Sequence, residues 1–331
     1  MKKNIAVVGC GHWGKNLVRN FAELGTLAAV CDPNDQLAQS YAEKYSVGNL
    51  SFAAILANPA VEGVVLAVPA SLHASMAIEA MNARKHMYVE KPLAMNRIEA
   101  EAMIASAKKN GVQLMVGHLL QYHPIFMAVR GHIESGELGS LSYIYSNRLS
   151  FGKVRSEEDV IWSFAPHDIS MILSLTGQEP EVVRTESSCI LQPDIADTAT
   201  VHMEFKSALK AHVSVSWLHP YKEQKLVVVG QGGMAVFDDT KPWNEKLALY
   251  RHVVQAADGL PSLEKAEVEY LEVPQSEPLR NECQHFINVV SENVAPLTNG
   301  EEGLSVLKVL SAASLSESKK EAVKLNKLRA Q

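Results

Sequence analysis

The first 120 residues of the chain alternate short apolar runs with longer amphipathic segments. The runs lack polar residues at alternate positions, which is typical of strands that are buried on both faces. Between the first two runs, apolar residues recur from Trp13 to Leu24 at the spacing of one helix face. Because strands and helices alternate in this way, we predict a parallel, doubly wound sheet. Its predicted strands are Ile5–Val8, Leu27–Val30, Val64–Val68, Met87–Val89 and Leu114–Val116.

The pattern changes after about residue 140. Residues 198–205 and 210–217 alternate apolar and polar side chains, as antiparallel strands do when one sheet face stays open. We therefore expect an α/β chain with a doubly wound domain over residues 1–122. A second α/β domain, with a mainly antiparallel and open-faced sheet, is expected over residues 123–331. Further strands are predicted at 226–229, 234–237 and 247–250, and helices at 123–135, 164–176, 278–292 and 301–318.

Composition argues against several classes of function. A length of 331 residues suits two domains of about 150 residues each. The formal net charge is -6 and no basic block stands out, so we expect neither nucleic acid nor a membrane surface as a partner. The longest apolar run, Val64–Ala70, is much shorter than the roughly 20 residues of a membrane span. We expect reduced thiols and a cytoplasmic protein, because no C-x-x-C pair occurs among Cys10, Cys31, Cys189 and Cys283.

A glycine-rich loop follows the first predicted strand. Residues 9–14 read G-C-G-H-W-G, the G-x-G-x-x-G spacing, and a predicted helix comes next. In this context the first glycine makes the turn, the second admits a pyrophosphate and the third packs helix on strand. The helix N-terminus offers free N–H groups to phosphates. Asp32 ends the next strand, where its carboxylate can accept both ribose hydroxyls and repel a 2′-phosphate. The sequence therefore predicts a Rossmann domain that binds NAD rather than NADP; a tight turn without a ligand is the alternative.

Three further segments resemble the glucose-fructose oxidoreductase, inositol dehydrogenase and rhizopine catabolism (Gfo/Idh/MocA) family. Residues 69–73 resemble its P-x-x-x-H segment, and residues 90–92 match its E-K-P signature. His167 falls where the family carries its active-site histidine. Residues 161–169 and 215–233 look like nucleotide-sugar 3-dehydrogenases, which act on UDP-N-acetylglucosamine or its uronic acid in surface-polysaccharide pathways. The resemblance covers the whole chain.

The resemblance implies an oxidoreductase in which NAD takes a hydride and the protein takes a proton. It assigns the catalytic roles to Lys91 and His167. Histidine exchanges protons near neutral pH, so His167 is the better general base, while Lys91 acts as acid/base or hydrogen-bond donor. The alternatives are a surface lysine beside Glu90 and a structural histidine. The resemblance also suggests a cis bond before Pro92, although most X–Pro bonds are trans.

Other residues are expected to line the cofactor site. His12 and Trp13 would offer backbone N–H groups, with the Trp13 side chain either there or in the core. His73 would line the cleft and Glu90 would reach the nicotinamide ribose; helix capping and strand-end packing are the alternatives. The expected cofactor-binding residues are Gly9, Gly11, His12, Trp13, Gly14, Asp32, Pro69, His73, Glu90 and Lys91.

The chain departs from the family pattern near the histidine. Ser163 stands where many members have an aspartate, so a second carboxylate at the substrate is not assumed. Asp168 would either orient the His167 imidazole or cap the helix. Arg148 and Arg155 could meet the diphosphate of a nucleotide sugar, or belong to a solvated basic loop. The expected substrate-binding residues are Lys91, Arg148, Lys153, Arg155, Ser163, His167 and Asp168.

The remaining expectations concern metals, assembly and alternative functions. His118 and His123 are five residues apart, which does not fit a helical zinc pair, so we expect no metal. The polar face with His202 and His212 suggests a homodimer or homotetramer through the open sheet, as relatives form. We expect oxidation of a sugar hydroxyl, at C3 of a UDP-N-acetylhexosamine or its uronate. A dehydrogenase of a free sugar or inositol, and a non-catalytic NAD- or sugar-responsive regulator, are the alternatives.

Overall fold

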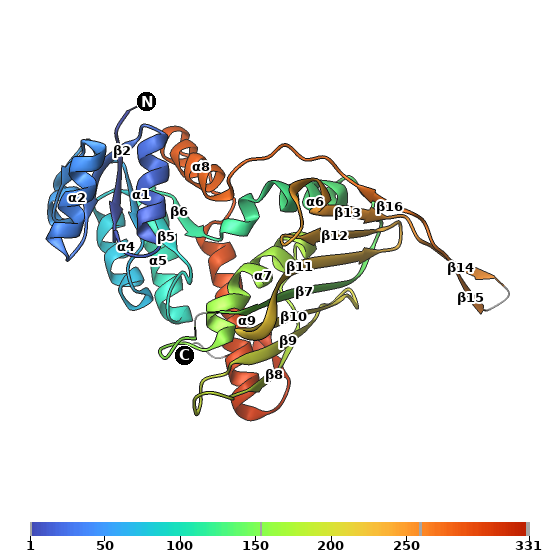
Figure 1. Ribbon diagram of the computed structural model, residues 1–331. Helices are drawn as coiled ribbons and strands as arrows, with labels where there is room; N and C mark the ends of the chain where they lie inside the picture. The colour runs from blue at the N-terminus through green and yellow to red at the C-terminus, as the bar shows by residue number, and fades with distance from the viewer. Residues whose placement is uncertain (1, 153, 258–259, 329–331) are drawn as a thin grey trace. The chain divides into compact units, whose positions relative to one another are not determined.

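A computed structural model describes residues 2–152, 154–257 and 260–328 of the chain (Figure 1). The chain separates into two compact units. Of the described residues, unit 1 comprises those up to Tyr122 together with Glu277–Leu307, and unit 2 comprises His123–Ser276 together with residues 308–328. The chain therefore first passes from unit 1 to unit 2 after Tyr122. Residues 277–307 differ from the expectation of two continuous domains, because they return to unit 1.

Unit 1 is built on a six-stranded sheet in the order β3-β2-β1-β4-β5-β6. Every neighbouring pair is parallel, which confirms the predicted doubly wound sheet. The strand order reverses at β1, so the carboxyl ends of β1 and β4 form the switch point where such sheets bind ligands. The strands are β1 Ile5–Val8, β2 Leu27–Cys31, β3 Gly48–Asn49, β4 Gly63–Leu66, β5 His86–Glu90 and β6 Leu114–Gly117.

Helices connect these strands, and a helix from late in the sequence completes the core of unit 1. In α8, Phe286 packs edge-on against Phe21 and Tyr88, with ring centroids 6.2 and 5.7 Å apart. All three side chains are fully buried, which explains why α8 belongs to unit 1. The helices of unit 1 are α1 Gly14–Glu23, α2 Asp35–Tyr45, α3 Phe52–Ala57, η1 Ala70–Leu72, α4 His73–Asn82, α5 Arg97–Asn110, η2 Leu119–Tyr122 and α8 Pro278–Glu292, with the first residues of α9 Gly300–Lys319.

Unit 2 is built on a nine-stranded sheet in the order β16-β13-β12-β11-β7-β10-β9-β8-β17. Its pairs are antiparallel except β7 with β10, which confirms the mainly antiparallel sheet. The long strand β7 and strand β8 were not delimited from sequence, because neither keeps a simple two-residue alternation. The strands are β7 Leu141–Phe151, β8 Val182–Ser188, β9 Thr198–Glu204, β10 Lys210–Ser216, β11 Leu218–Gly230, β12 Met234–Asp238, β13 Leu247–Tyr250, β16 Val268–Tyr270 and β17 Val323–Lys324, with the hairpin β14 Val253–Ala257 and β15 Leu260–Glu264.

One face of this sheet is covered and the other is open. Helix α7 (Val160–Thr176) contacts β7, β9 and β10. On β9, Val201 is fully buried whereas His202 is exposed, as the two-residue alternation predicted. Helix α6 (Pro124–Glu134) lies near the start of unit 2 in the sequence. Within the described ranges, no helix is both long enough and apolar enough to cross a lipid bilayer.

Candidate functional site

The glycine loop after β1 has the geometry that its three glycines predict. Gly9 has φ +94°, and a Cβ built on it would lie 2.3 Å from the carbonyl oxygen of Ala67. A Cβ on Gly14 would lie 1.9 Å from the Gly9 carbonyl oxygen, so both positions exclude a side chain. A Cβ on Gly11 would meet no atom within 4 Å. The backbone of Gly11 is therefore open to close approach by a ligand.

Helix α1 begins directly after this loop. No side chain caps its N-terminus, and its first turn carries no acidic residue. Its first N–H groups and the positive end of its dipole thus suit an anion. At the end of β2, the Asp32 carboxylate accepts hydrogen bonds from the backbone N–H groups of Cys10 at 2.7 Å and Asn34 at 2.9 Å. Asp32 therefore fastens the loop to β2 while remaining only partly buried.

The E-K-P segment is tied to the same loop. The indole N–H of Trp13 donates to Glu90 Oε1 at 2.6 Å, and the Tyr88 hydroxyl donates to the same oxygen at 3.2 Å. The Trp13 side chain is 39% exposed, so its alternative assignment to the core is wrong. Burial raises the pKa of Glu90, with the Trp13 hydrogen bond and the nearby Lys91 charge acting in the opposite direction. A Cβ on Gly117 would lie 2.9 Å from Glu90 Oε2, so this glycine makes room for the carboxylate.

His73 joins two segments of the site's backbone. Its side chain is buried, with Nδ1 2.8 Å from the Pro92 carbonyl oxygen and Nε2 3.0 Å from that of Val68. Burial lowers the pKa of His73, against the effect of the two carbonyl groups. A neutral imidazole carries one N–H, so it donates to one of these two carbonyl oxygens. His73 thus lies between the Pro69 turn and the E-K-P turn and supports the cofactor edge, the edge of the sheet where β1, β4 and β5 end, through the backbone. The Lys91–Pro92 bond is cis, as the resemblance suggested.

These features of unit 1 fit a bound dinucleotide. The open position at Gly11 and the uncapped start of α1 suit a pyrophosphate, and Asp32 is the carboxylate that the sequence predicts to meet a ribose. The remaining predicted cofactor residues lie on the same edge of the sheet. They are His12 in the loop, Pro69 after β4, and Glu90 and Lys91 at the end of β5.

In unit 2, helix α7 carries the predicted catalytic histidine. The helix begins at Val160, four residues before the predicted start, because the Asp159 carboxylate caps it by accepting from the Trp162 N–H at 3.0 Å. His167 lies two turns into the helix and is partly buried. The suggestion that Asp168 caps the helix is therefore wrong.

Asp168 is instead the centre of a buried polar network. It is 1% exposed and accepts hydrogen bonds from Ser146 Oγ at 2.5 Å and Arg148 Nε at 2.5 Å, with Arg148 Nη2 at 3.3 Å. Both carboxylate oxygens of Asp168 therefore bind β7, and neither is directed by these contacts to His167. The Arg148 charge, proposed from sequence for a phosphate, is paired within the protein.

The network continues through residues that the sequence did not single out. With its amide oriented to suit both neighbours, Gln224 accepts from Arg148 Nη1 and donates to Asp239 Oδ2, each at 3.2 Å. Asp239 also pairs with Lys246 at 2.5 Å and with His123 at 3.5 Å. No local motif marks these residues, because strand pairing between β7, β11 and β12 brings them together.

The other predicted substrate residues of unit 2 differ in exposure. Ser163 is buried within α7. Arg155 has a 45% exposed side chain and pairs with Glu158 at 3.0 Å. Lys153 lies outside the described residues.

Comparison with known proteins finds a family model that matches each of two successive segments of the chain. The family described as "Oxidoreductase family, NAD-binding Rossmann fold" matches residues 3–118, and the "GFO/IDH/MocA C-terminal domain" matches residues 126–236. UDP-N-acetylglucosamine 3-dehydrogenase of Acidithiobacillus ferrooxidans is 29% identical over 91% of this chain and 93% of its own length. Inositol 2-dehydrogenase of Rhizobium meliloti is 24% identical over 98% of this chain and all of its own length.

Solved structures agree with the sequence matches. A structure of the Acidithiobacillus ferrooxidans UDP-N-acetylglucosamine 3-dehydrogenase superposes with a TM-score of 0.85 at 27% identity, covering 96% of this chain and 97% of the other. The fold is thus shared over nearly the whole length of both chains. The chain belongs to the Gfo/Idh/MocA family of NAD-dependent oxidoreductases.

Proposed function

We propose that this oxidoreductase removes a hydride from C3 of a UDP-N-acetylhexosamine or its uronic acid, in the synthesis of surface-polysaccharide precursors. One observation carries the choice of substrate: the likeness to a UDP-N-acetylglucosamine 3-dehydrogenase extends over 91% of this chain and over both units. The family and the cofactor do not depend on this choice, since other dehydrogenases share them.

The proposed chemistry assigns the proton to two side chains. When the alcohol becomes a ketone, its carbon loses a hydride and its oxygen loses a proton. When bound, NAD is the acceptor of this hydride. Lys91 follows the strand whose last residue is fastened to the glycine loop through Trp13, so it lies at the cofactor edge of unit 1. We assign Lys91 to hold the substrate hydroxyl and His167 to take its proton.

The structure refines the proposed substrate contacts of unit 2. The Asp168–Arg148 pair is nearly buried, so we assign it to shape the wall behind His167. Arg155 is the more exposed arginine, and we assign it to the diphosphate. Ser163 remains a proposed substrate contact in place of the family aspartate. A cytoplasmic location is part of the proposal and rests on the four free cysteines.

A second candidate is a dehydrogenase of inositol or a free sugar, which the full-length match to inositol 2-dehydrogenase favours. The test is to incubate the protein with NAD and, in separate reactions, UDP-N-acetylglucosamine, its uronate, inositol and free hexoses, while following reduced-nicotinamide absorbance. We expect reduction with a UDP-sugar, amounting to one enzyme equivalent if NADH stays bound. Reduction with inositol or hexose alone would replace the proposal by the second candidate. Saturable sugar binding without reduction of NAD would identify a regulator.

A further inference from the structure

A buried glutamate lies beneath the cofactor edge of unit 1. Glu282 is on α8, at one position of the apolar stripe formed by Leu279, Cys283 and Phe286. Its side chain is 0% exposed. Neither of its carboxyl oxygens makes a hydrogen bond of ordinary geometry to a described residue. An ionised carboxylate in such surroundings costs several kcal/mol, so a residue of this kind needs a physical explanation.

The neighbours of Glu282 favour its neutral form. Burial, followed by the charge of Glu90, raises the pKa of Glu282 well above its ordinary value, and the Tyr88 hydroxyl acts in the opposite direction. The other titratable groups that sense its charge are Tyr122 on η2 and Cys283 on the same helix. Neither is a cation, so nothing among these groups compensates a negative charge.

Tyr88 connects this glutamate to the site. It is fully buried, and its hydroxyl donates to Glu90 Oε1. Burial, followed by the charges of Glu282 and Glu90, raises the pKa of Tyr88, so the phenol keeps its proton. A phenol oxygen that donates one hydrogen bond can still accept another. A neutral Glu282 can supply that proton, whereas an ionised one would compete with Glu90 for the Tyr88 proton.

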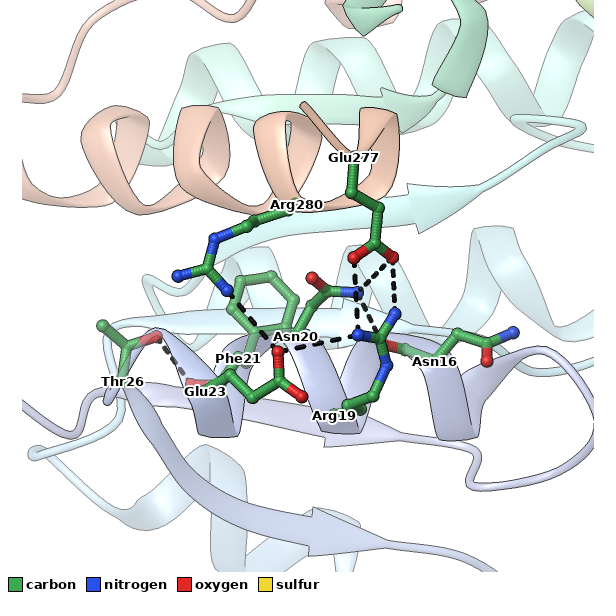
Figure 2. Close-up of polar contacts among 8 residues, drawn as sticks. All are labelled: Asn16, Arg19, Asn20, Phe21, Glu23, Thr26, Glu277 and Arg280. Atoms are coloured by element: carbon green, nitrogen blue, oxygen red, sulfur yellow. Dashed lines mark hydrogen bonds and ion pairs between the residues drawn. The ribbon is translucent and has the colours of Figure 1, made fainter. Parts of the chain in front are cut away.

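Surface contacts hold α8 in the position that buries Glu282. Figure 2 shows the start of α8 against α1, with the Glu277 carboxylate bound by Arg19 and Asn20 of α1. One turn further on, Arg280 pairs with Glu23 at 3.5 Å. Because α1 begins at the glycine loop, these ion pairs join α8 to the helix that starts at the cofactor edge.

We propose that the Glu282 carboxyl is a neutral acid that positions the Tyr88 hydroxyl and, through it, the Glu90 carboxylate at the end of β5. Glu282 is thus a positioning residue: it acts on the cofactor edge through two other side chains. The inference rests on the expected role of Glu90 at the cofactor, and it is independent of which sugar is oxidised.

The experiment compares Glu282→Gln with Glu282→Leu. Both variants remove the acid and leave the site neutral, but only glutamine retains a hydrogen-bond donor for Tyr88. We expect Glu282→Gln to bind NADH within about twofold of wild type. Glu282→Leu should bind NADH about tenfold more weakly, as expected for one lost hydrogen bond in the chain that holds Glu90. Its melting temperature should equal or exceed that of wild type, since leucine suits the apolar stripe. A purely structural role would instead make affinity and stability fall together.

Infrared difference spectroscopy reads the protonation state directly. At neutral pH, wild type should show a carboxylic-acid C=O band that is absent from both Glu282 variants. Glu292→Gln is the matched control: Glu292 is the last residue of α8 and is exposed, so the acid band should survive. An acid band that persists in Glu282→Gln, or unchanged NADH affinity in Glu282→Leu, would overturn the proposal. Neither measurement uses a sugar. Failure of the substrate proposal would appear separately, as the absence of NAD reduction in the assays with UDP-sugars.

Discussion

At the scale of single residues, the Asp32 carboxylate combines a structural contact with an assigned contact to the cofactor. It accepts hydrogen bonds from the glycine loop and from the turn after β2, and we assign it to a cofactor ribose. Replacement by alanine should weaken NAD binding by roughly 1–3 kcal/mol, because ribose hydroxyls lose their partner. The same change removes a charge that repels the NADP phosphate, so the preference for NAD should shrink.

Titration of wild type and Asp32→Ala with NAD and NADP measures this effect. Asp35→Ala serves as a control, since this exposed carboxylate lies on the same segment at the start of α2. Equal affinity of the wild-type protein for both cofactors would refute the assignment of Asp32.

Lys91 and His167 are the residues assigned to the proton. Lys91→Met and His167→Gln remove their proton chemistry with modest changes in volume. Each should slow single-turnover hydride transfer by about 10²–10⁴. If the two act as a unit, the double variant should be little slower than the slower single variant. NAD affinity should persist, because the pyrophosphate and ribose positions lie elsewhere, at Gly11 and Asp32. Hydride transfer in His167→Gln at the wild-type rate would remove its assignment as base.

At the scale of elements, the glycine loop has one glycine that the fold requires, Gly14, and one that we expect ligand binding to require, Gly11. A side chain at Gly14 would collide with the backbone of Gly9, whereas a side chain at Gly11 would enter open space. Gly14→Ala should therefore lower the melting temperature. Gly11→Ala should leave the melting temperature within a few degrees of wild type and weaken NAD binding by tenfold or more, since the methyl group occupies the place of the pyrophosphate. Calorimetry and cofactor titration on the two variants check this, and equal NAD affinity in Gly11→Ala would contradict it.

A second element-scale prediction concerns the turn after β12. Burial acts to raise the pKa of Asp239, but hydrogen bonds from His123 and Lys246 outweigh it and lower the pKa to about 2. A carboxylate whose pKa is lower in the folded state adds stability above its unfolded pKa, and that stability is lost as pH falls through the folded value. Asp239→Asn should thus lower the free energy of unfolding by about 2 kcal/mol near neutral pH. The difference in free energy of unfolding between wild type and Asp239→Asn should decrease as pH falls from about 4 towards 2.

Denaturant unfolding of wild type and Asp239→Asn across this pH range provides the measurement. Glu204→Gln is the control, because this carboxylate belongs to an exposed pair with Lys210. Such surface pairs contribute less than about 1 kcal/mol. A cost for Asp239→Asn that stays constant down to pH 2 would show that the carboxylate charge is not responsible.

At the scale of the whole molecule, the open face of the unit 2 sheet is the surface we assign to self-association. Its polar residues include Tyr145 and His212, whose rings stack with centroids 5.4 Å apart, and the directly opposed Thr200 and Ser214. We expect a homodimer or homotetramer, and we expect Ser214→Arg to dissociate it by placing a charge on this face. Ile98→Arg, on an exposed position of α5, should leave the assembly intact. Light scattering after size exclusion measures the mass, and a monomeric wild type would refute the assignment.

Much of the architecture could be predicted from the sequence because its causes are local. Strands buried on both faces need unbroken apolar runs, and the predicted runs of unit 1 correspond to β1, β2, β4, β5 and β6 within two residues at each end. The turn after β1 needs glycine at Gly9 and Gly14, where a Cβ would strike the backbone, so the G-x-G-x-x-G spacing predicted the loop. The two-residue strand β3 was missed because so short a segment has no period.

What the sequence by itself determined is therefore the alternation of elements, the cofactor loop and the family. Tertiary structure decided which distant charges meet. It paired Arg148 with Asp168, it brought α8 back to unit 1, and it brought Glu282 within electrostatic reach of Glu90. The physical reason is that local propensity depends on near neighbours, whereas the partner of a buried charge depends on strand order and helix packing. A glutamate inside an apolar helical stripe, as at Glu282, is a local sign of such a contact that the sequence analysis did not use.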